Sequence, residues 1–532
     1  MGYLLAAGTG RRSRKERIST TRKRDIILLC TLPVLLLVFA RPISNWLSSP
    51  PRAAVSSEKG EDFKCVNFTD PLTNKHDSLG LLPKGEKYMW YFPDAGFSNQ
   101  ARALKNALKI AMLLNRTLIL PPVTDHGEVK NGKCLRPRYT TSRRFKEKSW
   151  TAVRDHILNS RYLSIADVVD LKPLSPKIVR TIDLRVFLAL WCGLDVAGVC
   201  SGPKCRNFAS VCSPHWGTID ICAQRFLPIP SSKGENSSCL VYEVKDDCST
   251  TVWSSGENAV TRAYREHQLL QKLAQDPEIT ASSGSGTIIK RKDVVRTLAL
   301  GSEAADFFLL SFGSLFSTVY KHIELHVDIR AAVGDLETAK KLEGIQNQHA
   351  FTKEIMGGAK SLVEKISPSR QFFCAHVRLG DGVFARNWNK TLDPLRKKLE
   401  ELSKRFQRSQ KLKVFLMTDI NKERWNGTIL AEIDRNDRFQ VQTLDGHGDF
   451  IAHVAEQMMA AEHGFRLGFI PRISNAVKPL NSTTNNFVPD ARLYLEEVIC
   501  ACARLGFLGT LKSTISRNIE DLRSASLCPA RN

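Results

Sequence analysis

The stretch Tyr88–Pro122, YMWYFPDAGFSNQARALKNALKIAMLLNRTLILPP, predicts a complete strand–turn–helix–strand unit. Tyr88–Phe92 is an aromatic run of strand length, and Leu118–Leu120 is a short apolar run that is followed by prolines. Between them, apolar residues recur at helical spacing at Leu104, Ala107, Leu108, Ala111 and Leu114. Such a unit is typical of doubly wound α/β domains, whose ligands bind at the carboxyl ends of the strands.

The turn between the first strand and the helix, Asp94–Gln100, has the polar sequence DAGFSNQ. We expect Gly96 to permit the tight turn, and Ser98 or Asn99 to cap the helix. The turn lies at the edge of the sheet where a ligand would bind. The pattern alone fits an ordinary helix start and the wall of a binding site equally well.

The amino-terminal region predicts membrane attachment. Residues 1–25 hold eight Lys/Arg and two acids, and we interpret them as a cytosolic basic tail. Residues 26–40 carry no charge and are predicted to form a transmembrane signal anchor, with a cleaved signal peptide as the alternative. Residues 41–85 would be a stem. This arrangement predicts a single-pass type II protein of the Golgi membrane with its catalytic domain in the lumen, or else one of the endoplasmic reticulum.

Cysteine usage also favours a lumen. The chain has 14 cysteines and no Cys-x-x-Cys, which favours disulfides over zinc. Seven of them lie in a cysteine-rich insertion, residues 192–248. Cys374, within an apolar run, is predicted to be a buried free thiol. Six N-x-S/T sequons fit a glycosylated protein and begin at Asn67, Asn115, Asn236, Asn389, Asn426 and Asn481.

A length of 532 residues allows two or three domains. Residues 86–367 are expected to form a first α/β domain that includes the insertion, and Pro368 marks the hinge to a second domain, 368–532. In the second domain strands alternate with helices, which implies another parallel sheet. The expected strands are 371–377, 413–417, 439–444 and 507–511, and the expected helices are 390–410, 451–463, 491–505 and one ending at 523.

The sequence CAHVRLGDG, residues 374–382, places two chemically useful side chains on one face of a strand. His376 and Arg378 alternate at its carboxyl end, and the planar guanidinium of arginine suits a phosphate. In the alternative interpretation, Arg378 forms a structural ion pair with Asp381 or Asp419, and His376 is a hydrogen-bonded core residue.

A second polar cluster, GTLKSTIS at residues 509–516, precedes the last helix. Hydroxyls and free N–H groups at a helix N-terminus bind anions. The alternative is simple capping of the helix by Ser513 or Ser516. Thr418-Asp419 follows another strand, and it either contacts a base or ribose or caps the next helix.

Together these segments resemble the GDP-fucose protein O-fucosyltransferase family and its α1,6-fucosyltransferase relatives. The matching segments come in family order within residues 86–523: GFSNQ…LLNRTLILPP, FFCAHVRLGDG, VFLMTD and GTLKSTISRNIEDLR. The resemblance implies a GT-B fold, in which two Rossmann-like domains face across a cleft. It also implies an inverting enzyme that moves fucose from GDP-fucose to a hydroxyl of a protein Ser/Thr or a glycan, without a metal or other cofactor. Independently, the chain has no Asp-x-Asp pair to hold a divalent ion.

The resemblance also assigns roles. Arg378 would hold the donor β-phosphate beside His376, and Asn99 would reach the sugar phosphate. The other implied donor-binding residues are Asp381, Asp419, Ser513, Thr514 and Ser516, and Asp94 is the implied general base. Three positions depart from the family pattern: Ile515 replaces an aromatic residue, and Asp381 and Asp94 are each offset by one place.

Two other functions stay open. The same fold can use another nucleotide deoxysugar, or the chain can be a non-catalytic lumenal protein that binds a glycan or a protein. A pure binding module has no need of a diphosphate site, so the cluster around Arg378 favours the enzyme. Nucleic-acid binding is disfavoured, because the basic tail precedes the anchor and no aromatic platform accompanies it.

Overall fold

The computed structural model describes most of the chain beyond residue 81, and all of what it describes belongs to one compact unit within residues 65–532. The described residues are 82–125, 142–158, 161–191, 241–243, 251–253, 292–293, 298, 302–316, 326–328, 336–380, 384–386, 388–405, 410–466, 490–525 and 528. The predicted tail and anchor, most of the stem and of the cysteine-rich insertion, and Asp381 lie outside these ranges. None of the described helices is both long and apolar enough to span a membrane.

The first half of the chain contains a five-stranded parallel sheet with the strand order β3-β2-β1-β7-β4. The strands are β1 (Tyr88–Tyr91), β2 (Thr117–Leu120), β3 (Thr181–Asp183), β4 (Val241–Glu243) and β7 (Leu309–Phe312). β1 is the central strand and is buried along its whole length. A parallel strand covered on both faces needs apolar side chains throughout, which explains its aromatic sequence.

Successive residues of β1 enter two different cores. Tyr88 and Trp90 pack with the side chains of α3 and α5, whereas Met89 and Tyr91 pack with those of α2 and α12. The apolar stripe predicted for α2 is the face that it buries, although Leu114 lies beyond its end and is only partly buried. The helices of this half are α2 (Phe97–Leu113), α3 (Ser142–Leu158), α4 (Ile165–Val168), α5 (Leu184–Trp191) and α12 (Leu336–Gln346), with a 3-10 turn at Glu303–Ala305.

The turn before α2 differs from the prediction. Ala95, not Gly96, takes the left-handed conformation, with φ of 61°. Gly96 is the N-cap residue with φ of −72°, which any residue can adopt. No side chain caps the helix, so the predicted capping by Ser98 or Asn99 is wrong. Gln100 holds the turn instead, because its Nε2 donates to the carbonyl oxygens of Ala95 and Thr124, each at 2.7 Å.

The left-handed Ala95 gives a stability prediction. We expect Ala95→Gly to raise the free energy of unfolding by about 0.5–1 kcal/mol, because glycine adopts this φ without the clash of a Cβ. Urea unfolding measures the difference. Ala101→Gly is the matched control in the interior of α2, where the same change should cost about 1 kcal/mol. A destabilised Ala95→Gly variant would contradict the expectation.

The second half of the chain contains a four-stranded sheet with the order β11-β10-β9-β12, again entirely parallel. The strands are β9 (Phe373–Val377), β10 (Leu412–Thr418), β11 (Phe439–Gln442) and β12 (Gly506–Gly509). The predicted second parallel sheet is therefore confirmed, and the two parallel α/β sheets fit a GT-B-like fold. A separate three-stranded sheet has the order β5-β8-β6 and consists of β5 (Thr251–Trp253), β6 (Lys292–Asp293) and β8 (His326–Asp328).

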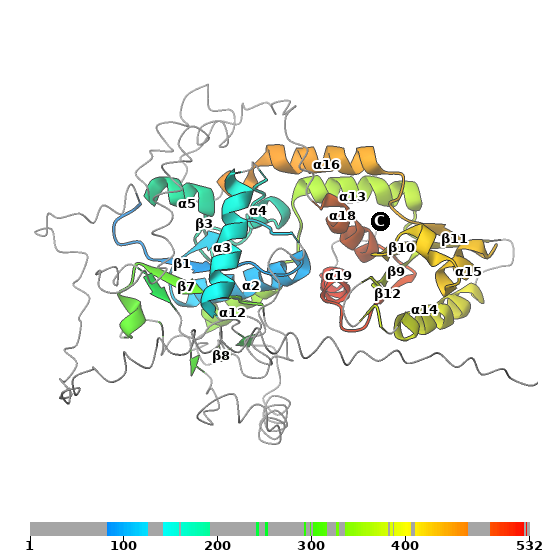
Figure 1. The fold of residues 1–532 in the computed structure, drawn as a ribbon. Helices are drawn as coiled ribbons and strands as arrows, with labels where there is room; N and C mark the ends of the chain where they lie inside the picture. The colour runs from blue at the N-terminus through cyan, green and yellow to red at the C-terminus, as the bar shows by residue number, and fades with distance from the viewer. Residues whose placement is uncertain are drawn as a thin grey trace, which may run out of the picture. The chain divides into compact units, whose positions relative to one another are not determined.

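Helices cover both faces of this second sheet (Figure 1). Phe372, Cys374 and Phe415 face the core shared with α13, α16 and α18, while Phe373, Ala375 and Val414 face the core shared with α14 and α15. The helices of this half are α13 (Lys353–Ile366), α14 (Trp388–Ser403), α15 (Ile429–Arg435), α16 (Gly448–Ala461), α17 (His463–Arg466), α18 (Ala491–Ala501) and α19 (Thr514–Ser524), with a 3-10 turn at Lys422–Trp425.

One core cluster contains residues from both halves. Phe97, at the start of α2, lies edge-on to Tyr494 of α18 with ring centroids 4.6 Å apart. It also stacks on Phe351 of the α12–α13 connection, at 6.0 Å. The beginning of α2 is therefore packed directly against the second half of the chain.

The prediction that Cys374 is a buried free thiol is wrong. Cys374 forms a disulfide with Cys500, and the two Cα atoms are 5.2 Å apart. A second disulfide joins Cys502 to Cys528. The first bond forms because α18 packs on the face of β9 to which Cys374 points, a contact between residues 126 positions apart. The disulfide chemistry predicted from cysteine usage is thus present in the second half.

Candidate active site

The carboxyl ends of β9 and β12 are held together by one threonine. Thr510, directly after β12, donates its hydroxyl to the carbonyl oxygen of His376 at 2.9 Å. The same hydroxyl oxygen accepts the backbone N–H of Arg378 at 2.8 Å. The backbone of Arg378 is thereby fixed at the strand end. Arg378 is partly exposed, and its Cζ lies 4.9 Å from the centre of the Phe384 ring.

His376 connects β9 to the last helix. Its Nδ1 lies 2.7 Å from Ser516 Oγ in the first turn of α19. Burial, with a smaller contribution from the charge of Arg378, lowers the pKa of His376 to about 3. His376 is therefore neutral at physiological pH, and the positive charge of this strand end belongs to Arg378.

The amino-terminal end of α19 has the chemistry of an anion site. Ser513 is the N-cap residue, yet its side chain makes no capping hydrogen bond. Its hydroxyl is buried and has no hydrogen-bond partner among the described residues. The first backbone N–H groups of a helix have no acceptor within the helix and carry the positive end of its dipole. Thr514, next in sequence, is partly exposed and adds a second hydroxyl.

Asp419 supports the segment that follows Arg378. Its two carboxylate oxygens accept the backbone N–H groups of Leu379 at 2.7 Å and Gly380 at 3.0 Å. A Cβ on Gly380 would lie 3.0 Å from Oδ2 of Asp419, so glycine suits this close approach. Asp419 thus holds the backbone beside Arg378, and its contact with a nucleoside stays a prediction, as does the role of Asp381.

On the first half of the chain, the predicted residues occupy different environments. Asp94 is only 1% exposed and accepts a hydrogen bond of 2.5 Å from Ser314 Oγ. Asn99 is partly exposed in the first turn of α2, and its Oδ1 finds no hydrogen-bond partner in the part of the chain described. The general-base role of Asp94 and the sugar-phosphate contact of Asn99 both stay predictions.

Four residues that the sequence analysis did not single out hold these groups in place: Thr510, Ser314, Glu497 and Asn518. Glu497 is fully buried and accepts hydrogen bonds from Ser98 Oγ at 2.9 Å and from Asn518 Nδ2. Of these four residues, only Thr510 could have been recognised from the sequence, because it lies near the end of a predicted strand. Ile515, where the family pattern has an aromatic residue, packs against the core cluster that contains Phe372.

Glu497 gives a prediction about pH and stability. Burial, together with the charges of Asp490 and Glu496, raises the pKa of Glu497 from 4.5 to about 8. The unfolded chain ionises near pH 4.5 while the folded protein keeps the proton to about pH 8, so wild-type stability falls across this window. The loss is at most about 1.4 kcal/mol per pH unit.

The Glu497→Gln variant cannot ionise, so its stability relative to wild type should rise from pH 5 to pH 8 and then level off. Urea unfolding at several pH values measures this difference. Burial raises the pKa of Glu496 only to about 7, so the gain in Glu496→Gln should level off earlier. A difference for Glu497→Gln that is constant between pH 5 and pH 8 would refute the prediction.

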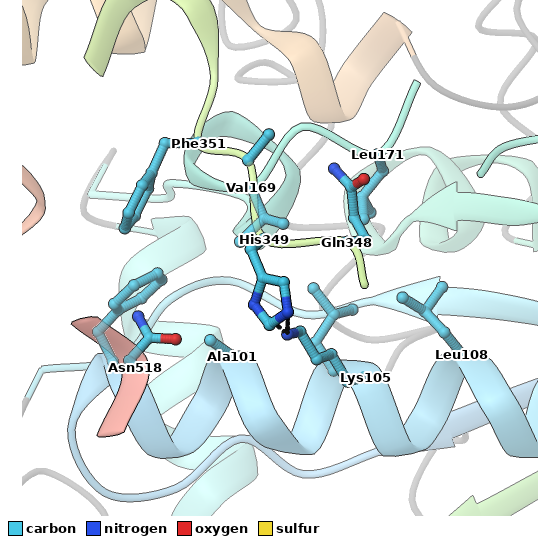
Figure 2. Close-up of a pocket in the computed structure, with 12 residues that line it drawn as sticks. Ala101, Lys105, Leu108, Val169, Leu171, Gln348, His349, Phe351 and Asn518 are labelled. Carbon is cyan, nitrogen blue, oxygen red and sulfur yellow. Dashed lines mark hydrogen bonds between the residues drawn. The ribbon is translucent and has the colours of Figure 1, made fainter. Parts of the chain in front are cut away.

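A small pocket lies between α2, the α12–α13 connection and Asn518 of α19 (Figure 2). In it, His349 points toward Lys105, whose Nζ lies 2.7 Å from His349 Nδ1. Burial lowers the pKa of Lys105 to about 8 and that of His349 to about 4. None of the predicted site residues lines this pocket. Within the described residues, no group of three or more His, Cys, Asp or Glu side chains could hold a metal.

The fold and the site define a class. Two parallel α/β sheets, with an arginine and a helix N-terminus at adjacent strand ends, fit a nucleotide-binding enzyme of the GT-B type. Over 511 residues the chain is 31% identical to O-fucosyltransferase 30 of Arabidopsis thaliana, covering 95% of each protein. The chain therefore belongs to the O-fucosyltransferase family, and it is a glycosyltransferase. No family model matches it.

Two solved structures are also similar. POFUT1 in complex with GDP is 11% identical, with 83% of this chain and 96% of that chain covered and a TM-score of 0.35. The fucosyltransferase NodZ from Bradyrhizobium is 11% identical, with 82% and 92% covered and a TM-score of 0.31. Likenesses this low add nothing to the assignment, which rests on the sequence relationship.

Proposed function

We propose that the protein transfers fucose from GDP-fucose to an acceptor hydroxyl with inversion at the sugar carbon. The family membership supports fucose transfer. One observation carries the proposal to particular residues: Thr510 and the His376–Ser516 hydrogen bond lock Arg378 and the amino-terminal turn of α19 side by side. An anionic diphosphate is the ligand that such a pair of positive groups favours.

The proposed chemistry is stabilisation of the leaving group. Breaking the sugar–phosphate bond builds negative charge on the diphosphate and positive charge on the sugar. Arg378 would bind the β-phosphate, and Ser513 and Thr514 would donate hydroxyls beside the helix N–H groups. Donors that are preorganised toward developing charge contribute about 3–4 kcal/mol each. Because Ser516 is already bonded to His376, its part would be to hold α19 in place.

The other predicted residues have secondary roles in this proposal. Asn99 would contact the sugar phosphate from α2, and Asp381 and Asp419 would lie near the nucleoside. Asp94 remains the proposed general base. Because Asp94 is buried and accepts a hydrogen bond from Ser314, its contribution as a base would be small. The mechanism would then depend mainly on an acceptor hydroxyl that is held in line with the leaving group.

The acceptor would be a hydroxyl of a protein Ser/Thr or of a glycan in the Golgi lumen. The two disulfides support an oxidising compartment. Residues 26–40 would anchor the chain in the membrane, and residues 86–367 and 368–532 would form the two domains.

Nucleotide binding and donor turnover test the proposal on the full-length protein in detergent micelles. GDP at a hundred times its Kd should add about 2.7 kcal/mol of stability, and UDP and ADP should add little. The protein should also release GDP from GDP-fucose. Stabilisation by UDP instead would point to another nucleotide deoxysugar. No stabilisation by any nucleotide would favour a binding protein and overturn the proposal.

A further inference from the structure

A single buried carboxyl group joins the two halves of the chain beside the proposed donor site. Glu497 lies in α18 and has no exposed surface. Its Oε1 accepts a hydrogen bond of 2.9 Å from Ser98 Oγ of α2, and its Oε2 accepts one from Asn518 Nδ2 of α19. The side chain of Glu497 therefore links α18 to the neighbouring α19 and to α2, which is about 400 residues away in the sequence.

The two partners of Glu497 lie next to residues that the proposed function uses. Ser98 precedes Asn99 in the first turn of α2. Asn518 lies one turn beyond Thr514 in α19. A hydrogen-bonded helix is stiff over one turn, so the position of Ser98 sets that of Asn99, and the position of Asn518 sets that of Ser513 and Thr514.

We propose that Glu497 is a positioning residue for fucose transfer: it holds the first turns of α2 and α19 at the spacing that donor turnover needs. This inference rests on the proposed function, since it is that function which assigns the two turns to the donor. Glu497 itself would touch neither the nucleotide nor the sugar, because both of its oxygens are occupied and it is fully buried.

The surroundings of Glu497 favour its neutral form. The charges that act on it are those of Asp490 and Glu496 on its own helix. The guanidinium of Arg492 is bound to Glu496 and Asp445. The groups that α2 and α19 hydrogen-bond to Glu497 are the neutral Ser98 and Asn518. Burial and the two charges raise the pKa of Glu497 to about 8, and they outweigh the hydrogen bonds from Asn518 and Ser98, which lower it.

The variants are chosen to keep or to break the hydrogen bonds that the neutral Glu497 makes with Ser98 and Asn518. Protonation reverses the direction of the first hydrogen bond, because the O–H of Glu497 then donates to Ser98 Oγ, while the other oxygen still accepts from Asn518 Nδ2. Glutamine has one donor and one acceptor in the same places, so Glu497→Gln should keep the bridge. Leucine has a similar volume and neither group, so Glu497→Leu should break it. Ser98→Ala removes only the link to α2.

Glu496→Gln is the matched control. It makes the same chemical change at the next position of α18, where the carboxylate is also buried. Its hydrogen-bond partner is Arg492 of the same helix, so the variant leaves the contacts to α2 and α19 intact.

The experiment measures kcat and KM for GDP release from GDP-fucose by the full-length protein, along with GDP affinity and Tm. Glu497→Leu and Ser98→Ala should each lower kcat by about tenfold to a hundredfold, because a displacement near 1 Å is enough for that loss. In Ser98→Ala, GDP affinity should change less than threefold, since this variant leaves Arg378 and the contact of Glu497 with α19 intact. The double variant Ser98→Ala/Glu497→Leu should be no slower than Glu497→Leu alone. Glu497→Gln should have most of the wild-type kcat.

Wild-type kcat in Ser98→Ala, or a lower Tm with unchanged kcat in Glu497→Leu, would overturn the inference. Should Glu497→Leu fail to fold, Ser98→Ala and Asn518→Ala decide the question alone. A wild-type protein that neither binds GDP nor releases it from GDP-fucose would overturn the proposed function instead. An active wild type with unaffected variants overturns only the role of Glu497.

Discussion

Replacing Arg378 with alanine is expected to remove most of the stabilisation by GDP and to lower donor turnover by about 10²–10³-fold. The side chain stands at the end of β9, next to a histidine that stays neutral because burial lowers its pKa to about 3. His376 therefore cannot replace the lost charge. Thermal shifts with GDP and the rate of GDP release from GDP-fucose measure the two effects.

Two variants show whether the effect belongs to this guanidinium. Arg378→Lys keeps the charge but loses the planar pair of N–H donors, so its turnover should fall between those of wild type and Arg378→Ala. Arg396→Ala removes an equal charge from α14, where Arg396 pairs with Glu432 on the surface. It should bind GDP as wild type does. Equal GDP stabilisation of Arg378→Ala and wild type would refute the assigned role.

The strands that the sequence predicted best are those whose signals are local. β9 and β10 are short runs of buried residues that alternate with helices, and this pattern implies a parallel sheet without any knowledge of tertiary contacts. β1 and α2 were predicted for the same reason. The ends of the elements shifted by a few residues, because helix and strand ends depend on neighbours in space.

Features that depend on distant residues were not predictable. β7 is an interior strand of the first sheet, between β1 and β4, but LLSF is too short to distinguish from a buried helix segment. The left-handed residue of the first turn is Ala95 although Gly96 adjoins it, because packing rather than local preference decides the turn. Cys374 pairs with a cysteine 126 residues away, and no local sequence pattern reveals a pairing over that distance.

In the candidate site, too, residues with a local sequence signal were predicted, and residues whose role depends on distant contacts were not. The family resemblance implied that His376, Arg378 and Ser516 share a site, and the structure brings these residues together at the ends of β9 and β12. The residues that hold them were missed. Glu497 looks like a surface residue in the sequence LYLEEV, and only the approach of α2 and α19 shows that it is buried.

Replacing Gly509 with alanine is expected to damage both stability and activity. A Cβ at this position would lie 2.4 Å from Ser516 Cβ and 2.5 Å from Ser516 Oγ. Because Ser516 is held by His376, α19 has to move away from β12 to make room. The free energy of unfolding should fall by about 1–3 kcal/mol. Donor turnover should fall by about tenfold to a hundredfold, since the first turn of α19 moves with Ser516.

Two further variants separate the clash from a general effect of alanine. Gly357→Ala in α13 adds a Cβ that meets no atom within 4 Å, so it should raise stability by up to about 1 kcal/mol. The double variant Gly509→Ala/Ser516→Gly removes the clashing atoms and should regain part of the lost stability. It should not regain turnover, because His376 then has no Ser516 hydroxyl to bind. Recovery of both would mean that the His376–Ser516 hydrogen bond is not needed to position α19.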